Sequence, residues 1–203
     1  MQRKKRTAIL ISGRGSNMRA LIDAAKAAEF PAEIVLVFSN VEGAAGLDFA
    51  RAQGIPTKVI SHKVFASREE FDAAVDAALG AAHVELVCLA GYMRILSDGF
   101  ARKWEGRMLN IHPSLLPAFP GTHVHEQVLA AGVTVSGCTV HFVVPELDAG
   151  PIIALAQVPV LGGDTPDTLA ARVLEEEHKL YPAALRKLAE GKVVLRDGRA
   201  VTI

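Results

Sequence analysis

The sequence has few of the features that mark secreted, membrane-spanning or nucleic-acid-binding proteins. Its two cysteines, Cys88 and Cys138, both stand in apolar runs, which indicates small buried side chains in a reducing compartment rather than a disulfide. No run approaches the roughly 20 apolar residues that a membrane span needs. Lys and Arg together number 22, as do Asp and Glu, so the basic excess typical of nucleic-acid binding is missing. We expect a soluble, cytoplasmic protein with no membrane or nucleic-acid partner.

The basic start at residues 1–6 does not have the form of a targeting signal. The apolar run at residues 7–12 is too short for the core of a signal peptide, and no small-residue cleavage site follows it. We expect the basic start to be a solvated end. The chain has 203 residues, half of them hydrophobic, so a single domain over residues 1–203 with a sizeable core is expected.

Short apolar runs alternate with amphipathic segments from residue 7 to residue 131. The apolar runs carry few charges, as expected of strands buried on both faces. They predict strands at 7–12, 33–39, 56–60, 86–90 and 108–111. Helices are predicted at 18–28, 44–53, 67–82, 97–103 and 123–131. Ser67 and Glu70 form a capping box at the start of the third helix. This alternation is typical of right-handed βαβ units on a parallel sheet.

The pattern changes after residue 131. Residues 135–144 and 151–160 are β-rich, and the six residues between them are too few for a helical crossover, so these strands should be antiparallel. A last helix is predicted from Thr165 to about residue 190, where Pro182 could interrupt it, followed by a hairpin around Asp197-Gly198. The predicted fold is α/β: a doubly wound, mostly parallel sheet of about seven strands, with antiparallel C-terminal strands, helices on both faces and a Rossmann-like N-terminal half.

The turn Gly13-Arg14-Gly15-Ser16-Asn17 joins the first predicted strand to a helix. Glycines let the backbone approach an anion, and the start of a helix offers unpaired N–H groups. No Gly-Lys-Ser/Thr follows, so the turn is not a Walker loop, and no Asp or Glu stands just after the second strand as in NAD-binding proteins. The turn fits a single phosphate of a mononucleotide or sugar phosphate. The alternative is a plain strand-to-helix turn in which Asn17 caps the helix.

Asn110 and His112 stand two residues apart near the end of the fifth predicted strand, so their side chains share one face. Pro113 and Pro117 have no backbone N–H to donate, so neither a helix nor a strand pairing should continue through them. The strand should therefore lead Asn110 and His112 into a rigid, irregular loop. An amide that donates, beside an imidazole that can donate or move a proton, suits a carbonyl that becomes an oxyanion. Asp148 is the candidate carboxylate that sets the charge of the imidazole. The alternative is a structural His before Pro, with Asp148 as a turn residue.

Other polar residues have simpler interpretations. Zinc binding is suggested by four histidines, His112, His123, His125 and His141. Their spacing, and the lack of Cys or Glu at ligand spacing, argue against a metal. We expect His123 to cap or begin a helix and His141 to pack near the site. Asp72 and Asp76 are expected on a solvated helix face, and Trp104 in the core or at its rim.

Five motifs together resemble the phosphoribosylglycinamide formyltransferase family over about residues 7–191. They are Ile11-Ser12-Gly13-Arg14-Gly15-Ser16-Asn17, Val37-Phe38-Ser39-Asn40, Leu89-Ala90-Gly91-Tyr92-Met93-Arg94-Ile95-Leu96, Asn110-Ile111-His112-Pro113-Ser114-Leu115-Leu116-Pro117 and Val140-His141-Phe142-Val143. The family transfers the formyl group of 10-formyltetrahydrofolate to the amine of glycinamide ribonucleotide in purine synthesis. The resemblance implies the same activity here, by direct transfer through a tetrahedral intermediate, with 10-formyltetrahydrofolate as co-substrate and no metal, in a monomer or homodimer.

The resemblance also implies roles for single residues. The catalytic group matches Asn110, His112 and Asp148. The phosphate and ribose contacts match Gly15, Ser16, Asn17, Met18, Leu174, Glu175, Glu176 and Glu177. The folate contacts match Arg68, Met93, Arg94, Ile95, Leu96, Asn110, Val144, Pro145, Glu146, Leu147 and Asp148. Residues from about 7 to 105 would bind the nucleotide phosphate, and those from about 106 to 191 would bind folate and carry catalysis. Ala118 stands where the family often has Lys, so the charge at the mouth of the site could differ.

Three other functions compete with formyl transfer. Hydrolases of 10-formyltetrahydrofolate resemble the same catalytic domain but carry an N-terminal regulatory domain, and only about six residues precede the first predicted strand here. A methionyl-tRNA formyltransferase would carry a C-terminal RNA-binding domain and a basic surface. A nucleotide-binding module without catalysis would keep the Gly-rich turn but would have no use for Asn110, His112 and Asp148 together. Formyl transfer is the predicted function, and hydrolysis is the nearest alternative.

Overall fold

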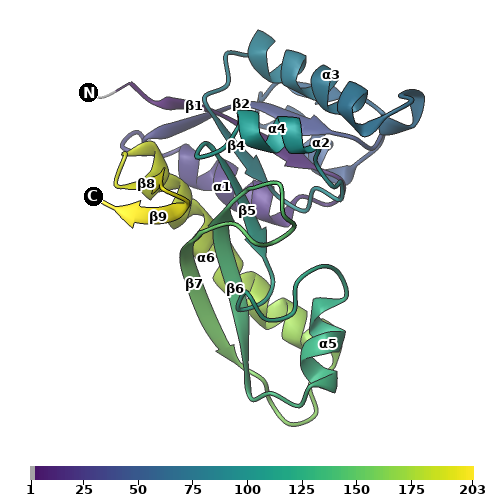
Figure 1. The fold of residues 1–203 in the computed structure, drawn as a ribbon, viewed down its shortest axis with the longest axis vertical. Helices are drawn as coiled ribbons and strands as arrows, with labels where there is room; N and C mark the ends of the chain where they lie inside the picture. Colours follow the sequence, from purple (N-terminus) through teal and green to yellow (C-terminus); the bar gives the residue numbers. More distant parts are fainter. Residues whose placement is uncertain (1–2) are drawn as a thin grey trace.

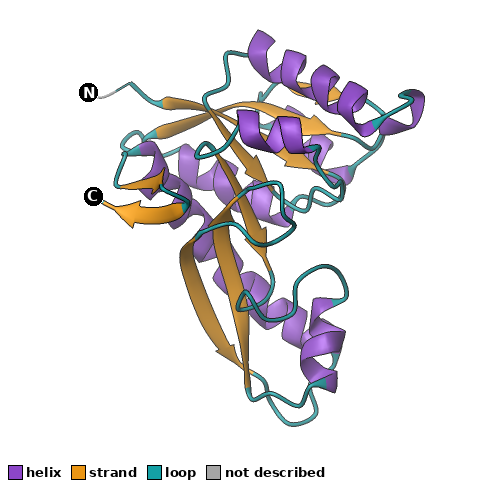
Figure 2. Cartoon of the chain, in the orientation of Figure 1, coloured by secondary structure: helices purple, strands orange, loops and turns teal. Residues whose placement is uncertain are grey.

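Seven strands form one mixed sheet, and a C-terminal hairpin forms a separate two-stranded sheet (Figures 1 and 2). The computed structural model describes residues 3–203. The strands of the large sheet are β1 (Lys5–Ile11), β2 (Ala32–Ser39), β3 (Thr57–Val59), β4 (Leu86–Leu89), β5 (Met108–His112), β6 (Val135–Phe142) and β7 (Ile152–Pro159). Their order is β3-β2-β1-β4-β5-β6-β7, with parallel pairing from β3 to β5 and antiparallel pairing from β5 to β7. The predicted α/β fold is confirmed.

Helices cover both faces of the sheet because the parallel strands are apolar on both sides. The helices are α1 (Ser16–Ala25), α2 (Ala45–Ala52), the short 3-10 helix η1 (His62–Val64), α3 (Arg68–Ala81), α4 (Asp98–Lys103), α5 (Val124–Ala130) and α6 (Pro166–Ala189). In β4, Leu86 and Cys88 pack with α1, α2 and α6, whereas Val87 and Leu89 pack with α3 and α4. The lower part of Figure 1 shows α5 beside the first turns of α6 and the far ends of β6 and β7.

The fifth strand runs further than predicted. β5 ends at His112, one residue beyond the predicted strand, so His112 lies on the strand together with Asn110. Met108 lies two residues before Asn110 and therefore on the same face of the strand, where it packs with α3 and α4, whereas Leu109 packs with α6. Asn110 and His112 therefore extend from the sheet face that α3 and α4 cover further along.

The prediction for Asp72 and Asp76 was wrong. Asp72 is 2% exposed, and its carboxylate accepts a 2.6 Å hydrogen bond from the backbone N–H of Ser97. Asp76 accepts hydrogen bonds from Lys103 and from the Trp104 indole. Both carboxylates face α4, whose ends supply the hydrogen-bond donors. The sequence pattern of α3 alone does not reveal these partners.

Pro182 does not interrupt the last helix, which is continuous from Pro166 to Ala189. A proline removes one backbone hydrogen bond, but Tyr181 and Leu185 on either side are fully buried against the sheet. Thr165, where the helix was predicted to begin, caps it through reciprocal hydrogen bonds with Thr168. The predicted hairpin is formed by β8 (Val193–Arg196) and β9 (Arg199–Thr202).

The cysteines and the basic start differ in how well they match the predictions. Cys88 and Cys138 are free and buried, as predicted. The basic start is not wholly a solvated end, because Lys5 and Arg6 belong to β1 and both bond to Glu85; residues 1–2 lie outside the described part of the chain. Within residues 3–203, no helix has the length and apolar character needed to cross a membrane.

Candidate active site

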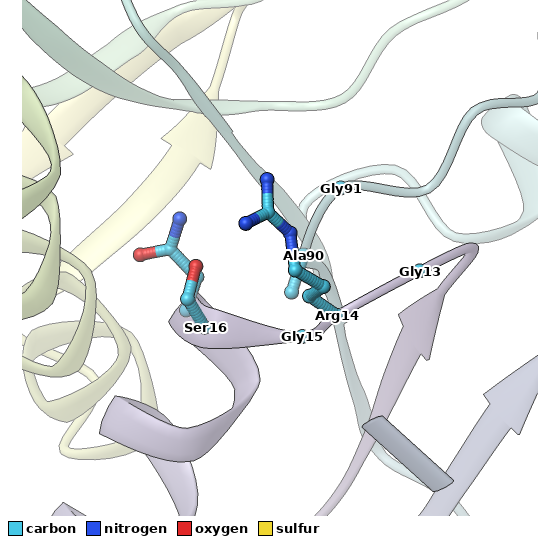
Figure 3. Close-up of a pocket in the computed structure, with 7 residues that line it drawn as sticks. Gly13, Arg14, Gly15, Ser16, Ala90 and Gly91 are labelled. Carbon is cyan, nitrogen blue, oxygen red and sulfur yellow. The ribbon is translucent and has the colours of Figure 1, made fainter. Parts of the chain in front are cut away.

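The Gly-rich turn between β1 and α1 borders a small open pocket of about 180 Å³ (Figure 3). The lining residues are Gly13, Arg14, Gly15, Ser16, Asn17, Ala90 and Gly91. Gly15 takes the N-cap position of α1 with a φ of 69°, and no side chain caps the helix. Asn17 is therefore not the cap, which leaves the first N–H groups of α1 available to an anion.

Arg14 was missing from the predicted site, yet its side chain lines this pocket. Figure 3 shows Arg14 beside Ser16 and Ala90. It is exposed, and no hydrogen bond or ion pair involves its side chain among the described residues. Its position inside the turn was the signal that could have identified it. Met18, in contrast, is fully buried in the core, so its side chain does not face the pocket.

Asn17 connects the turn to α6. Its amide donates a 2.7 Å hydrogen bond to the carboxylate of Glu177. Glu177 is buried; burial raises the pKa of its carboxyl, and the bond from Asn17 acts in the opposite direction. The neighbouring predicted residues do not share this contact, since Glu175 is exposed and Glu176 pairs with Lys179.

Asn110 lies directly opposite His141 in the antiparallel pairing of β5 with β6. The Asn110 amide nitrogen is 3.2 Å from His141 Nε2, and His141 Nδ1 is 2.8 Å from the Phe142 carbonyl. A carbonyl only accepts, so Nδ1 carries the proton and Nε2 accepts from the amide. Burial lowers the pKa of His141, which agrees with a neutral ring. His141 thus uses one amide N–H of Asn110 and leaves the other free.

His112 and Asp148 meet beside this pair. His112 Nδ1 is 3.5 Å from Asp148 Oδ2, and their side chains are 6% and 7% exposed. His112 Nε2 lies 2.8 Å from the carbonyl of Phe119, so it donates there. A second proton on Nδ1 would place a donor against the carboxylate. The same carboxylate oxygen accepts a 2.8 Å bond from the Gly121 N–H, which ties it to the loop after β5.

The backbone around Asp148 explains how the acid reaches the strand. Asp148 has a φ of 52°, in the left-handed region. Two residues later, a Cβ on Gly150 would lie 1.7 Å from the Phe142 carbonyl oxygen and 3.2 Å from His141 Nδ1. Only glycine permits this close approach. The structure therefore brings Asn110, His112 and Asp148 together, as the sequence predicted, and adds His141.

His123 and His125 lie at the start of α5. Burial, and to a lesser extent the charge of His112, lowers the pKa of His125. His123 takes the N-cap position of α5, as expected, but its side chain makes no cap bond and instead lies 3.0 Å from Glu126. Within residues 3–203, no three His, Cys, Asp or Glu side chains are grouped as a metal ion would require.

The segment predicted to hold folate runs from β4 to α4. Met93 and Ile95 are 68% and 56% exposed, although both are apolar, whereas Leu96 is buried. Arg94 lies over the Phe71 ring at 5.9 Å. Arg68, the first residue of α3, is exposed. In the predicted folate loop after β6, from Val144 to Asp148, Leu147 is exposed and only the Asp148 side chain is nearly buried.

Comparison with known proteins assigns the family. A family model described as formyl transferase matches residues 5–185, and the chain belongs to this family. It is 44% identical to phosphoribosylglycinamide formyltransferase of Escherichia coli, over 95% of this chain and 91% of that protein. Glycinamide ribonucleotide transformylase 1 of Symbiobacterium toebii has the same fold, with a TM-score of 0.95 and 45% identity over 98% of this chain and 94% of that one. The chain is also 56% identical to the trifunctional purine biosynthetic protein adenosine-3 of Bos taurus, but spans only 19% of its length.

Proposed function

We propose that the chain transfers the formyl group of 10-formyltetrahydrofolate to the amine of glycinamide ribonucleotide. The products would be formylglycinamide ribonucleotide and tetrahydrofolate, in purine biosynthesis in the cytoplasm. The observation that carries the proposal is the contact between His112 and Asp148 at 3.5 Å, on the same strand face as Asn110. The names and high identity of the relatives support the choice of substrates.

The geometry supports a direct transfer. The ribonucleotide amine attacks the formyl carbon, a C–N bond forms, and the carbonyl electron pair moves to oxygen. The free N–H of Asn110 can donate to this oxyanion, and a preorganised donor of this kind typically lowers the barrier by about 3–4 kcal/mol. The bond from formyl carbon to N10 of the folate then breaks. Asp148 can accept the proton of the attacking amine and pass it, directly or through water, toward N10.

His112 supplies the second donor. In the structure both ring nitrogens face protein groups, Nε2 the Phe119 carbonyl and Nδ1 the Asp148 carboxylate. Donation to the substrate oxygen therefore requires the ring to leave one of these partners. Phe119 lies in the loop after β5, so a shift of that loop would free Nε2 for the substrate oxygen while Nδ1 stays toward Asp148. We assign to Asp148 the role of holding the ring in this orientation.

The two substrates would approach from different parts of the sheet edge. The ribonucleotide phosphate would bind at Gly15, Ser16 and Asn17, with the ribose near Glu177. The folate would lie along Met93–Leu96, with Arg68 near its acidic tail and the Val144–Asp148 loop beside it. Residues from about 7 to 105 would then serve phosphate binding, and those from about 106 to 191 folate binding and catalysis.

One assay separates transfer from hydrolysis. Purified protein is mixed with 10-formyltetrahydrofolate, with and without glycinamide ribonucleotide, and the release of tetrahydrofolate is followed. Transfer predicts release only when the ribonucleotide is present, with one formylated product per folate released. Equal release without the ribonucleotide would show hydrolysis instead, and no release under either condition would contradict the proposal.

A further inference from the structure

Within residues 3–203, the segment from Tyr92 to Leu96 pairs with no strand, although buried and exposed side chains alternate along it as in a strand. Tyr92 and Leu96 are buried in the cluster formed with α3 and α4. Met93 and Ile95 point the other way and are exposed. Two large apolar side chains held outward on one short segment form a surface suited to a flat, largely apolar ring. Such a surface binds a ring well only if the segment keeps a fixed position. The hydrogen bonds that hold the two ends of the segment therefore matter for binding.

Both ends of this segment are held by side chains from other elements. The N–H of Met93 donates a 2.8 Å hydrogen bond to Ser12 Oγ at the end of β1. The N–H of Ser97 donates a 2.6 Å hydrogen bond to Asp72 Oδ2 in α3. The first anchor adjoins the Gly-rich turn, and the second comes from α3, which also carries Arg68.

The Asp72 bond is not needed to begin α4. Ser97 already caps this helix with its own side chain, which accepts from the Phe100 N–H. Asp72 instead holds the backbone N–H of Ser97, which is where the exposed segment ends. Its carboxylate is buried, and its second oxygen has no partner among residues 3–203. Burying a carboxylate with a single bond is costly, so a contribution to stability alone is a poor reason for an acid at this position.

Other polar groups surround the same region. The Tyr92 hydroxyl and Arg94 Nε are also buried without partners among the described residues. Burial raises the pKa of Tyr92, and the negative charge of Asp72 adds to this effect while Arg94 opposes it. Asp72 of α3 therefore lies among buried polar groups that belong to the segment itself, Tyr92 and Arg94.

We propose that Asp72 is a positioning residue for folate binding: it fixes the C-terminal end of Met93–Leu96 and so sets the surface on which the pterin lies. This inference rests on the proposed function, since it assigns folate to that segment. Asp72 does not touch the reacting atoms, and its loss should act on folate affinity rather than on the chemical step.

The test compares two acids that lie one turn apart on α3. Asp72→Ala removes the acceptor from Ser97, whereas Asp76→Ala removes the bonds to Lys103 and Trp104 at the other end of α4. For Asp72→Ala we expect the KM for 10-formyltetrahydrofolate to rise about five- to tenfold, the effect of a net hydrogen bond of roughly 1–1.5 kcal/mol. The KM for the ribonucleotide and kcat should stay within about twofold. Asp76→Ala should leave all three values unchanged while lowering the Tm.

Asp72→Asn keeps an oxygen that can accept from Ser97, so it should restore most of the folate affinity. This conservative variant keeps the proposal testable if Asp72→Ala does not fold. Binding of tetrahydrofolate, measured by calorimetry in the absence of the ribonucleotide, separates this inference from the proposed function, because it is readable even if no transfer occurs. An unchanged tetrahydrofolate affinity in Asp72→Ala would overturn the inference, as would an equal loss in Asp76→Ala. An Asp72→Asn variant that folds and binds as weakly as Asp72→Ala would also overturn it.

Discussion

Asn17 in α1 donates a 2.7 Å hydrogen bond to Glu177 in α6, although 160 positions separate the two residues. The bond joins the turn that lines the pocket to the helix that packs across the sheet. It also fixes the orientation of the Asn17 amide beside the proposed phosphate. A buried carboxylate therefore takes part in shaping the pocket, and its protonation should be visible in the stability of the fold.

The first prediction concerns Glu177 and pH. Burial raises its pKa above the ordinary value of 4.5, so the folded protein keeps this proton where the unfolded chain has lost it. The Glu177 contribution to the free energy of unfolding then falls as pH rises from 4.5 through the raised value. Glu177→Gln imitates the protonated acid and should gain stability over the wild type as pH rises. Urea midpoints at pH 4.5 and pH 8 measure this. Glu176→Gln is the control, and a pH-independent difference for Glu177→Gln would contradict the prediction.

The second prediction concerns Arg14. Its exposed guanidinium beside the pocket should attract the ribonucleotide phosphate, so Arg14→Asn should raise the ribonucleotide KM by about fivefold, since an exposed ion pair contributes up to roughly 1 kcal/mol. The kcat and the folate KM should not change. Arg19→Gln removes the same charge from α1, where the guanidinium lies over the Phe49 ring, and should have no such effect.

Salt gives a second check on Arg14. Exposed charge pairs are screened as ionic strength rises, so the difference between wild type and Arg14→Asn should shrink in high salt. A KM difference that is the same at low and high ionic strength would indicate a change in the shape of the turn rather than a lost charge.

The third prediction concerns Gly150. A Cβ there would lie 1.7 Å from the Phe142 carbonyl oxygen, so Gly150→Ala should displace the backbone that carries Asp148. We expect a loss of about 2–4 kcal/mol in the free energy of unfolding and a marked fall in kcat. Gly162→Ala is the matched control, because its Cβ would meet nothing within 4 Å. Chemical denaturation of both variants is the measurement, and equal stability of the two would contradict the reading of this turn.

Local patterns were sufficient to predict most of the elements and one side of the site. The period of two in a strand placed Asn110 and His112 on one face, and the short spacing between residues 144 and 151 predicted the antiparallel pair β6–β7. The Gly-rich turn predicted the pocket next to α1. These features depend on neighbours in sequence, which is why they can be read from the chain.

The features that were missed depend on partners distant in sequence. Asp72 and Asp76 were predicted to be solvated because α3 shows only its own pattern, whereas their partners come from α4. Pro182 continues a helix because Tyr181 and Leu185 pack against the sheet. The role of His141 as the acceptor for Asn110 required the register between β5 and β6. Arg14 was overlooked because the glycines around it supplied a sufficient explanation of the turn.

The central claim is that Asn110, His112 and Asp148 act together on one formyl group. Asp148→Asn tests it most directly, because the amide keeps the volume and can still accept from the Gly121 N–H but loses the charge that faces His112. We measure kcat for formyl transfer to glycinamide ribonucleotide together with the thermal unfolding curve. The prediction is a fall in kcat of about 10²–10³-fold with a Tm close to that of the wild type. A folded Asp148→Asn variant with kcat within about threefold of the wild type, well short of that loss, would contradict the account.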